Sequence, residues 1–142
     1  MAPSPPSSRS SASVFRHIDW AALGAVAGGG LIGSAARTGV TMWVPTPQGS
    51  FPTAVLVVNL TGSFLLGLYV ARRERAITGR RSLQFWAIGV LGSFTTFSAF
   101  GFDVVRLTTA GRLLAAGSYV AVSVLGGLAL VLAGSRIGAA IK

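Results

Sequence analysis

The chain has 142 residues, 51% of them hydrophobic and only 11% charged, whereas soluble domains carry about a quarter charged residues, so a soluble globular domain is excluded. The net charge of +9 does not indicate nucleic-acid binding, because the arginines flank hydrophobic stretches and form no basic stripe with aromatic residues. The absence of cysteine excludes disulfides, thiolate metal sites and cysteine nucleophiles.

Residues 1–15 are rich in proline, serine and alanine, and this composition predicts a disordered tail. Residues 16–142 predict one four-helix transmembrane domain, because four hydrophobic stretches each approach the roughly 20 residues needed to cross a bilayer. The expected spans are about 20–36, 51–71, 83–102 and 113–134. The expected connectors are 38–50, 72–82 and 103–112, which are too short to hold a soluble domain.

The first stretch has an alternative interpretation, because Arg16, the apolar run and the small residues that end it resemble a cleaved signal peptide. Glycines spaced by four residues favour a retained helix instead, since they let membrane helices approach closely. Two such pairs occur here, Gly24 with Gly28 and Gly29 with Gly33.

The basic residues predict one orientation, because short loops rich in lysine and arginine stay in the cytoplasm. Four spans place both termini and the loop between the second and third spans on one side. Nine basic residues fall there: Arg9, Arg16, Arg72, Arg73, Arg75, Arg80, Arg81, Arg136 and Lys142. Three fall on the other side: Arg37, Arg106 and Arg112. We therefore expect a multi-pass protein of the cell membrane with both termini in the cytoplasm.

Polar side chains recur inside the second and fourth stretches, where hydrocarbon offers no hydrogen-bond partner. Asn59 and Ser63 are four residues apart and share a helical face, and Tyr119 and Ser123 repeat this spacing. An asparagine amide offers two N–H donors, and each hydroxyl offers one. Serines of this kind also serve as packing contacts between helices, and that alternative stays open for Ser63.

The third stretch contains Gly92-Ser-Phe-Thr-Thr-Phe-Ser-Ala-Phe100, which places glycine and hydroxyl groups at mid-membrane depth. Such groups are tolerated only where they are buried in protein or line a wet cavity. Phe97 and Phe100 are three residues apart and project from one side. Ring edges carry partial positive charge, so neutral donors and phenylalanine edges together suit a small anion that must bind and escape.

Three segments carry a family resemblance: Gly33-Ser-Ala-Ala-Arg37, Val58-Asn-Leu-Thr-Gly-Ser-Phe64 and the run from Gly89 to Phe100. On these residues the chain resembles the CrcB/Fluc fluoride channels over roughly residues 24–134. The resemblance implies an all-α membrane protein with four transmembrane helices, the third broken near its middle, in an antiparallel dimer with two pores. It implies a passive, fluoride-selective channel that exports fluoride from the cytoplasm and reduces its toxicity.

The resemblance also assigns site residues. The implied fluoride path is Asn59, Thr96, Phe97, Ser98, Phe100, Tyr119 and Ser123. The backbone carbonyls of Gly92 and Thr95 are implied to hold a sodium ion at the dimer interface, an arrangement that suits a hard cation. Arg37 is implied to lie near a pore mouth, although a plain interfacial anchor is an equal alternative.

Two positions depart from the family pattern, with Asp103 where a glutamate is common and Gly127 where a serine is common. The charge bias yields a further hypothesis. An antiparallel homodimer needs a chain that inserts both ways, so nine basic residues against three favour an antiparallel heterodimer with an oppositely oriented homologue. The expected partners are thus fluoride, sodium, membrane lipid and this homologue, without nucleic acid.

Other classes remain as alternatives. A structural or assembly subunit of the membrane would need no aligned donors. A small multidrug exporter needs a membrane-embedded carboxylate, whereas Asp19, Glu74 and Asp103 are all expected at span edges. An enzyme is not expected, because the only histidine is His17 and no nucleophile with a matching base is evident.

Overall fold

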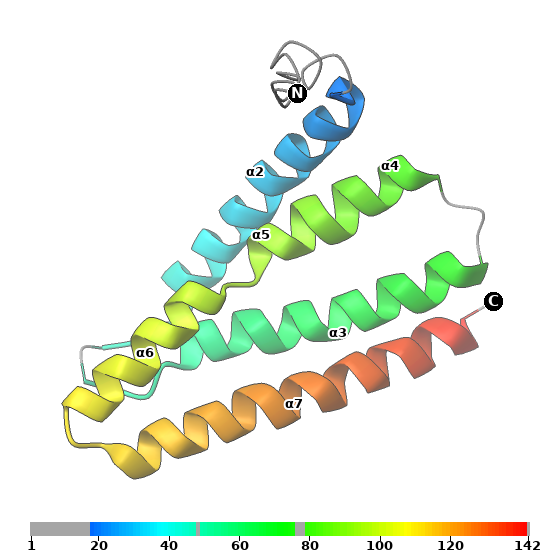
Figure 1. Cartoon of the computed structure of the whole chain (residues 1–142). Coiled ribbons are helices and arrows are strands. Elements are labelled where there is room, and N and C mark those ends of the chain that lie inside the picture. Colours follow the sequence, from blue (N-terminus) through cyan, green and yellow to red (C-terminus); the bar gives the residue numbers. More distant parts are fainter. Residues whose placement is uncertain (1–17, 48, 76–78, 142) are drawn as a thin grey trace, which may run out of the picture.

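The computed structural model describes residues 18–47, 49–75 and 79–141, where all the regular structure is helical. The helices are α2 (Trp20–Trp43), α3 (Thr53–Arg75), α4 (Arg80–Leu83), η1 (Gln84–Leu91), α5 (Gly92–Phe94), α6 (Phe97–Thr109) and α7 (Leu113–Ala140). The segment η1 has the wider turns of a π-helix and continues α4 into α5, so the chain forms four long helical arms (Figure 1). The predicted tail, 1–15, lies outside the described residues.

Three of the arms match the predicted membrane spans. Among the described residues, the stretches long and apolar enough to cross a membrane are Thr53–Arg73, Arg80–Thr109 and Leu113–Ala140. The first predicted span forms α2, whose 24 residues extend about 36 Å, but its glycines and Arg37 dilute its apolar character and it is not among the three. The chain is therefore a multi-pass helical membrane protein.

Two expected connectors are partly helical instead. Helix α2 runs on to Trp43 within the expected connector 38–50, and α6 covers most of the expected link 103–112. Polar side chains in α6 form hydrogen bonds within the helix. The Thr108 and Thr109 hydroxyls donate to the carbonyls of Val104 and Val105 at 2.8 and 3.0 Å. The helix ends only before Gly111, whose φ of 72° few other residues adopt.

Helix α2 packs against η1 and α5 through glycine. A Cβ at Gly29 would overlap the carbonyl oxygen of Phe85, and one at Gly33 would overlap the carbonyl oxygen of Val90. The close approach predicted for this pair is therefore confirmed. The other pair makes no such close contact within the subunit, since a Cβ at Gly24 would meet nothing within 4 Å and one at Gly28 only a ring carbon at 3.9 Å.

Helices α3 and α7 run side by side in the same direction (Figure 1), again with glycine at the contact. A Cβ at Gly67 would overlap the Val131 carbonyl oxygen of α7, and one at Gly134 would overlap the Phe64 carbonyl oxygen of α3. Backbone contact at both places fixes the distance between α3 and α7. This distance sets how close their side chains come at the site described next.

Candidate functional site

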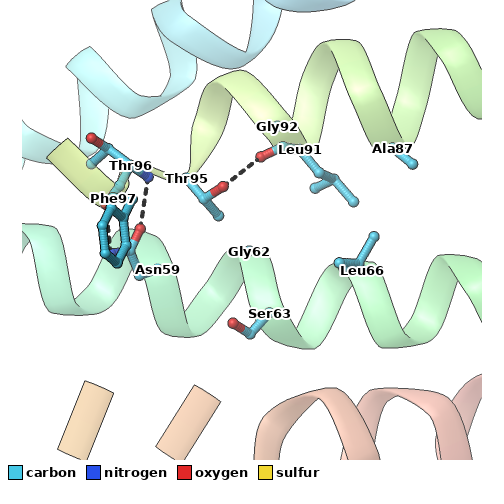
Figure 2. Close-up of a pocket in the computed structure, with 10 residues that line it drawn as sticks. All are labelled: Asn59, Gly62, Ser63, Leu66, Ala87, Leu91, Gly92, Thr95, Thr96 and Phe97. Atoms are coloured by element: carbon cyan, nitrogen blue, oxygen red, sulfur yellow. Dashed lines mark hydrogen bonds between the residues drawn. The ribbon is translucent and has the colours of Figure 1, made fainter. Parts of the chain in front are cut away.

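The third arm is interrupted at Thr95 and Thr96, where the backbone is extended between α5 and α6. Asn59 of α3 reaches this interruption with both ends of its amide (Figure 2). Its Oδ1 accepts the Thr96 N–H at 2.8 Å, and its Nδ2 donates to the Thr96 carbonyl at 3.0 Å. The side chain thus satisfies two backbone groups that the interruption removes from the helical pattern.

Neighbouring hydroxyls complete this arrangement. The Thr95 Oγ1 donates to the Leu91 carbonyl at 3.0 Å, which closes the last turn of α5. The Thr96 Oγ1 accepts the Ala99 N–H at 3.2 Å and so caps α6. The interruption is therefore held by specific hydrogen bonds, with the carbonyl end of one helix and the N–H end of the next facing it. The first end favours a cation and the second an anion.

An open pocket of about 310 Å³ lies beside the interruption, between α3 and the third arm (Figure 2). Its lining includes Asn59, Phe97 and the two residues expected to hold sodium, Gly92 and Thr95. Within the described residues no group of three or more His, Cys, Asp or Glu side chains could hold a metal ion. A cation here would rely on backbone and hydroxyl oxygens, which are the hard ligands that sodium-like ions take.

Aromatic rings lead away from the pocket. The ring centroids of Phe97 and Phe100 are 5.7 Å apart, and those of Phe100 and Tyr119 are 5.2 Å apart. Tyr119 is fully buried, and its hydroxyl and that of Ser123 are buried without a hydrogen-bond partner among the residues described. Buried hydroxyls are costly when unpaired, so these two donors are available to a ligand.

The remaining predicted residues line a second pocket of about 320 Å³, together with Thr38 and Thr41. Arg37 lies there with Thr96 and Ser98, whose hydroxyls are 3.2 Å apart. Thr96 lines both pockets, so the two pockets meet at the interruption and together hold seven of the ten predicted site residues. Phe100 and Tyr119 join them through the ring contacts, and Ser123 lies one turn beyond Tyr119 on α7.

Sequence reasoning missed two features of this region. Phe51 packs edge-on against Tyr119 with centroids 5.6 Å apart, and its place at the start of the expected span 51–71 gave no signal for this contact. Asp103, expected in a polar link at a span edge, instead lies inside α6 with only 8% of its surface exposed. It pairs with Arg106 at 3.2 Å, and Arg106 also donates to the Ser50 carbonyl at 3.3 Å. This pairing engages the carboxylate that proton-coupled export would require.

Known proteins match most of this chain. The family described as CrcB-like protein, Camphor Resistance (CrcB), matches residues 24–135. The "Fluoride-specific ion channel FluC 2" of Nocardia farcinica is 42% identical over 119 residues, 83% of this chain and 85% of that protein. The "Fluoride-specific ion channel FluC" of Thermus thermophilus is 42% identical over 118 residues, 82% of this chain and 92% of that protein. The "Fluoride-specific ion channel FluC" of Idiomarina loihiensis is 40% identical over 109 residues, 76% of this chain and 84% of that protein.

Proposed function

Because this chain belongs to the CrcB-like protein family, we propose that it has the activity named in its relatives and is a fluoride-specific ion channel. It passes fluoride passively out of the cytoplasm and thereby lowers fluoride toxicity. The observation that carries this proposal is the line from the Asn59-held interruption through Phe97 and Phe100 to the Tyr119 hydroxyl, which is buried without a partner in the described part of the chain. An ion channel is not an enzyme, so no residue is given a catalytic role.

Uncharged donors suit this task. Fluoride is small and strongly hydrated, so a path must replace water contacts with hydrogen bonds yet release the ion quickly. The second N–H of Asn59 and the hydroxyls of Tyr119 and Ser123 supply such donors, and the edges of Phe97 and Phe100 add partial positive charge between them. Arg37 stands in the second pocket, where its charge raises the local concentration of anions without closing on the ion.

The third helix is proposed to be a discontinuous membrane helix, and its interruption to hold a structural sodium ion. The carbonyls of Gly92 and Thr95 would supply ligands, because both residues line the pocket at the carbonyl end of α5. Half-helix ends facing a break are a recurrent way of holding ions inside membranes. A bound cation would offset the partial negative charge there and stabilise the interruption.

A second subunit is proposed to cover this pocket in an antiparallel dimer with two pores, which would also place the sodium ion at the interface. Phe97 supports this, because 84% of its surface is exposed although it belongs to the aromatic line. Gly92→Val tests it, since a Cβ there would meet only the Ala87 carbonyl at 3.6 Å within the subunit. We expect the variant to fold but to crosslink poorly as a dimer. Dimerisation at the level of the parent would refute this interface.

Nine basic residues against three support a single orientation with cytoplasmic termini, and hence a partner that is an oppositely oriented homologue. The ends of α3 and α7 and the start of α4, which carry six of the nine, lie at one end of the molecule (Figure 1). Lipid would surround the outer apolar faces of both subunits.

Fluoride efflux from liposomes, read with a fluoride electrode and a chloride control, tests the function. Liposomes should contain the chain alone or together with a homologue. Selective efflux in either case supports the channel, and efflux only with the homologue also supports the heterodimer. Efflux from the chain alone would refute the need for a partner. Folded protein that passes no fluoride in either case would refute the function.

A further inference from the structure

The buried hydroxyls of α7 form a line that stops at a glycine. Tyr119 and Ser123 are four residues apart on one face, and the next position on that face is Gly127. The first two carry buried hydroxyls without partners among the described residues, and Gly127 is itself buried. Because glycine has no side chain, α7 offers no side-chain donor one turn beyond Ser123.

Ser63 of α3 lies opposite this gap. A Cβ added at Gly127 would stand 3.4 Å from the Oγ of Ser63, an ordinary contact distance. Ser63 also lines the pocket beside the interruption, one turn beyond Asn59 on the same face of α3. In Figure 2 its side chain lies on the side of α3 that faces α7. Its oxygen thus lies between the pocket and the line of hydroxyls on α7.

The fold makes no visible use of this hydroxyl. Other helical hydroxyls, such as those of Thr38, Thr108 and Ser135, donate to carbonyls three or four residues earlier in their own helix. No hydrogen bond of Ser63 is found among the residues that the structure describes, and the same holds for Thr61 on another face of α3. Ser63 differs from Thr61 because it lines the pocket and lies close to Gly127. A hydroxyl that bonds back to its own helix is engaged by the backbone, whereas the Ser63 hydroxyl remains free to donate to an ion.

We propose that Ser63 is part of the fluoride path and supplies, from α3, the donor that α7 lacks at Gly127. This inference rests on the proposed channel function. Close packing of α3 on α7 brings the hydroxyl within reach of an ion passing Ser123, and an uncharged donor keeps binding escapable. The line of donors therefore crosses from one helix to the other.

Three variants test the proposal in the fluoride efflux assay: Ser63→Ala, Gly127→Ser and the two combined. Ser63→Ala should lower efflux about tenfold, which corresponds to one weakened hydrogen bond at the barrier. Its melting temperature should stay near that of the parent, because it removes one oxygen and breaks no bond of the fold. The double variant should recover efflux, because a hydroxyl returns at the same level from the opposite helix. Thr61→Ala, on another face of α3, is the control and should conduct as the parent does.

Parental efflux from Ser63→Ala, with the parent conducting, would overturn the proposal and leave the channel function standing. A lower melting temperature without recovery in the double variant would also overturn it, because Ser63 would then be a packing residue. A parent that passes no fluoride would overturn the channel function and this inference with it.

Discussion

Replacing Asn59 with aspartate changes one atom of the side chain and should affect stability and flux by different amounts. The Nδ2 that donates to the Thr96 carbonyl at 3.0 Å becomes an oxygen without a proton, while the Oδ1 contact with the Thr96 N–H at 2.8 Å is kept. Leaving a partly buried carbonyl without its donor costs about 1–3 kcal/mol. We expect the free energy of unfolding to fall by about this amount.

Flux should fall much further. A fixed negative charge about 4 Å from a passing anion raises its energy by roughly 4 kcal/mol at an effective dielectric constant near 20. That corresponds to about a thousandfold loss of efflux, because each 1.4 kcal/mol is a factor of ten. Assembly should persist, since Asn59 takes no part in the glycine contacts between helices.

Asn59→Ala separates the two effects, because it removes both bonds to Thr96 without adding charge. It should also melt below the parent, but it should be the less impaired of the two variants in fluoride efflux. Thr61→Val, exposed on another face of α3, serves as the control. An Asn59→Asp variant with the melting temperature and efflux of the parent would refute the reasoning, since neither the bond to Thr96 nor the path past Asn59 would then matter.

Two further predictions concern the aromatic line and the helix contacts. Phe100→Ile should abolish fluoride efflux while assembly is kept, because the ring 5.2 Å from that of Tyr119 is lost, whereas Phe102→Ile, at an exposed position, should conduct normally. Equal efflux in both would contradict the role of Phe100. Gly134→Ala should lower the free energy of unfolding by about 1–3 kcal/mol, because its Cβ overlaps a carbonyl of α3, whereas Gly117→Ala, in open space, should melt as the parent does.

The sequence located the functional region because membrane helices make polar residues conspicuous. Asn59 stood out as an amide in an apolar run, and the helical period placed Ser63 on its face. The helical period does not show, however, which residues of other helices a side chain contacts. The bonds between Asn59 and Thr96 join positions 37 residues apart, and only the packing of α3 against the third arm brings them together.

The differences from expectation have the same origin. Asp103 was expected to begin a polar link between helices, because a charge seemed to end the apolar run, yet Arg106, one turn on, pairs with it and the helix continues. Gly24 and Gly28 share the spacing of Gly29 and Gly33, but only the second pair faces η1 closely. Spacing defines a face, and the neighbouring helix decides whether that face is used.

The proposed path is best traced through donors that the fold leaves free, not through polar residues in general. The Thr95 hydroxyl donates to the Leu91 carbonyl at the end of α5, and the Thr96 hydroxyl accepts the Ala99 N–H at the start of α6. Both hydroxyls therefore stabilise the interruption. Asn59 uses one N–H for the Thr96 carbonyl and keeps the other. The hydroxyls of Tyr119 and Ser123 bond to none of the residues that the structure describes. One set of polar groups thus fixes the backbone and the other remains for the ion, so substitutions in the first set should lower stability and flux together, whereas those in the second should lower flux alone.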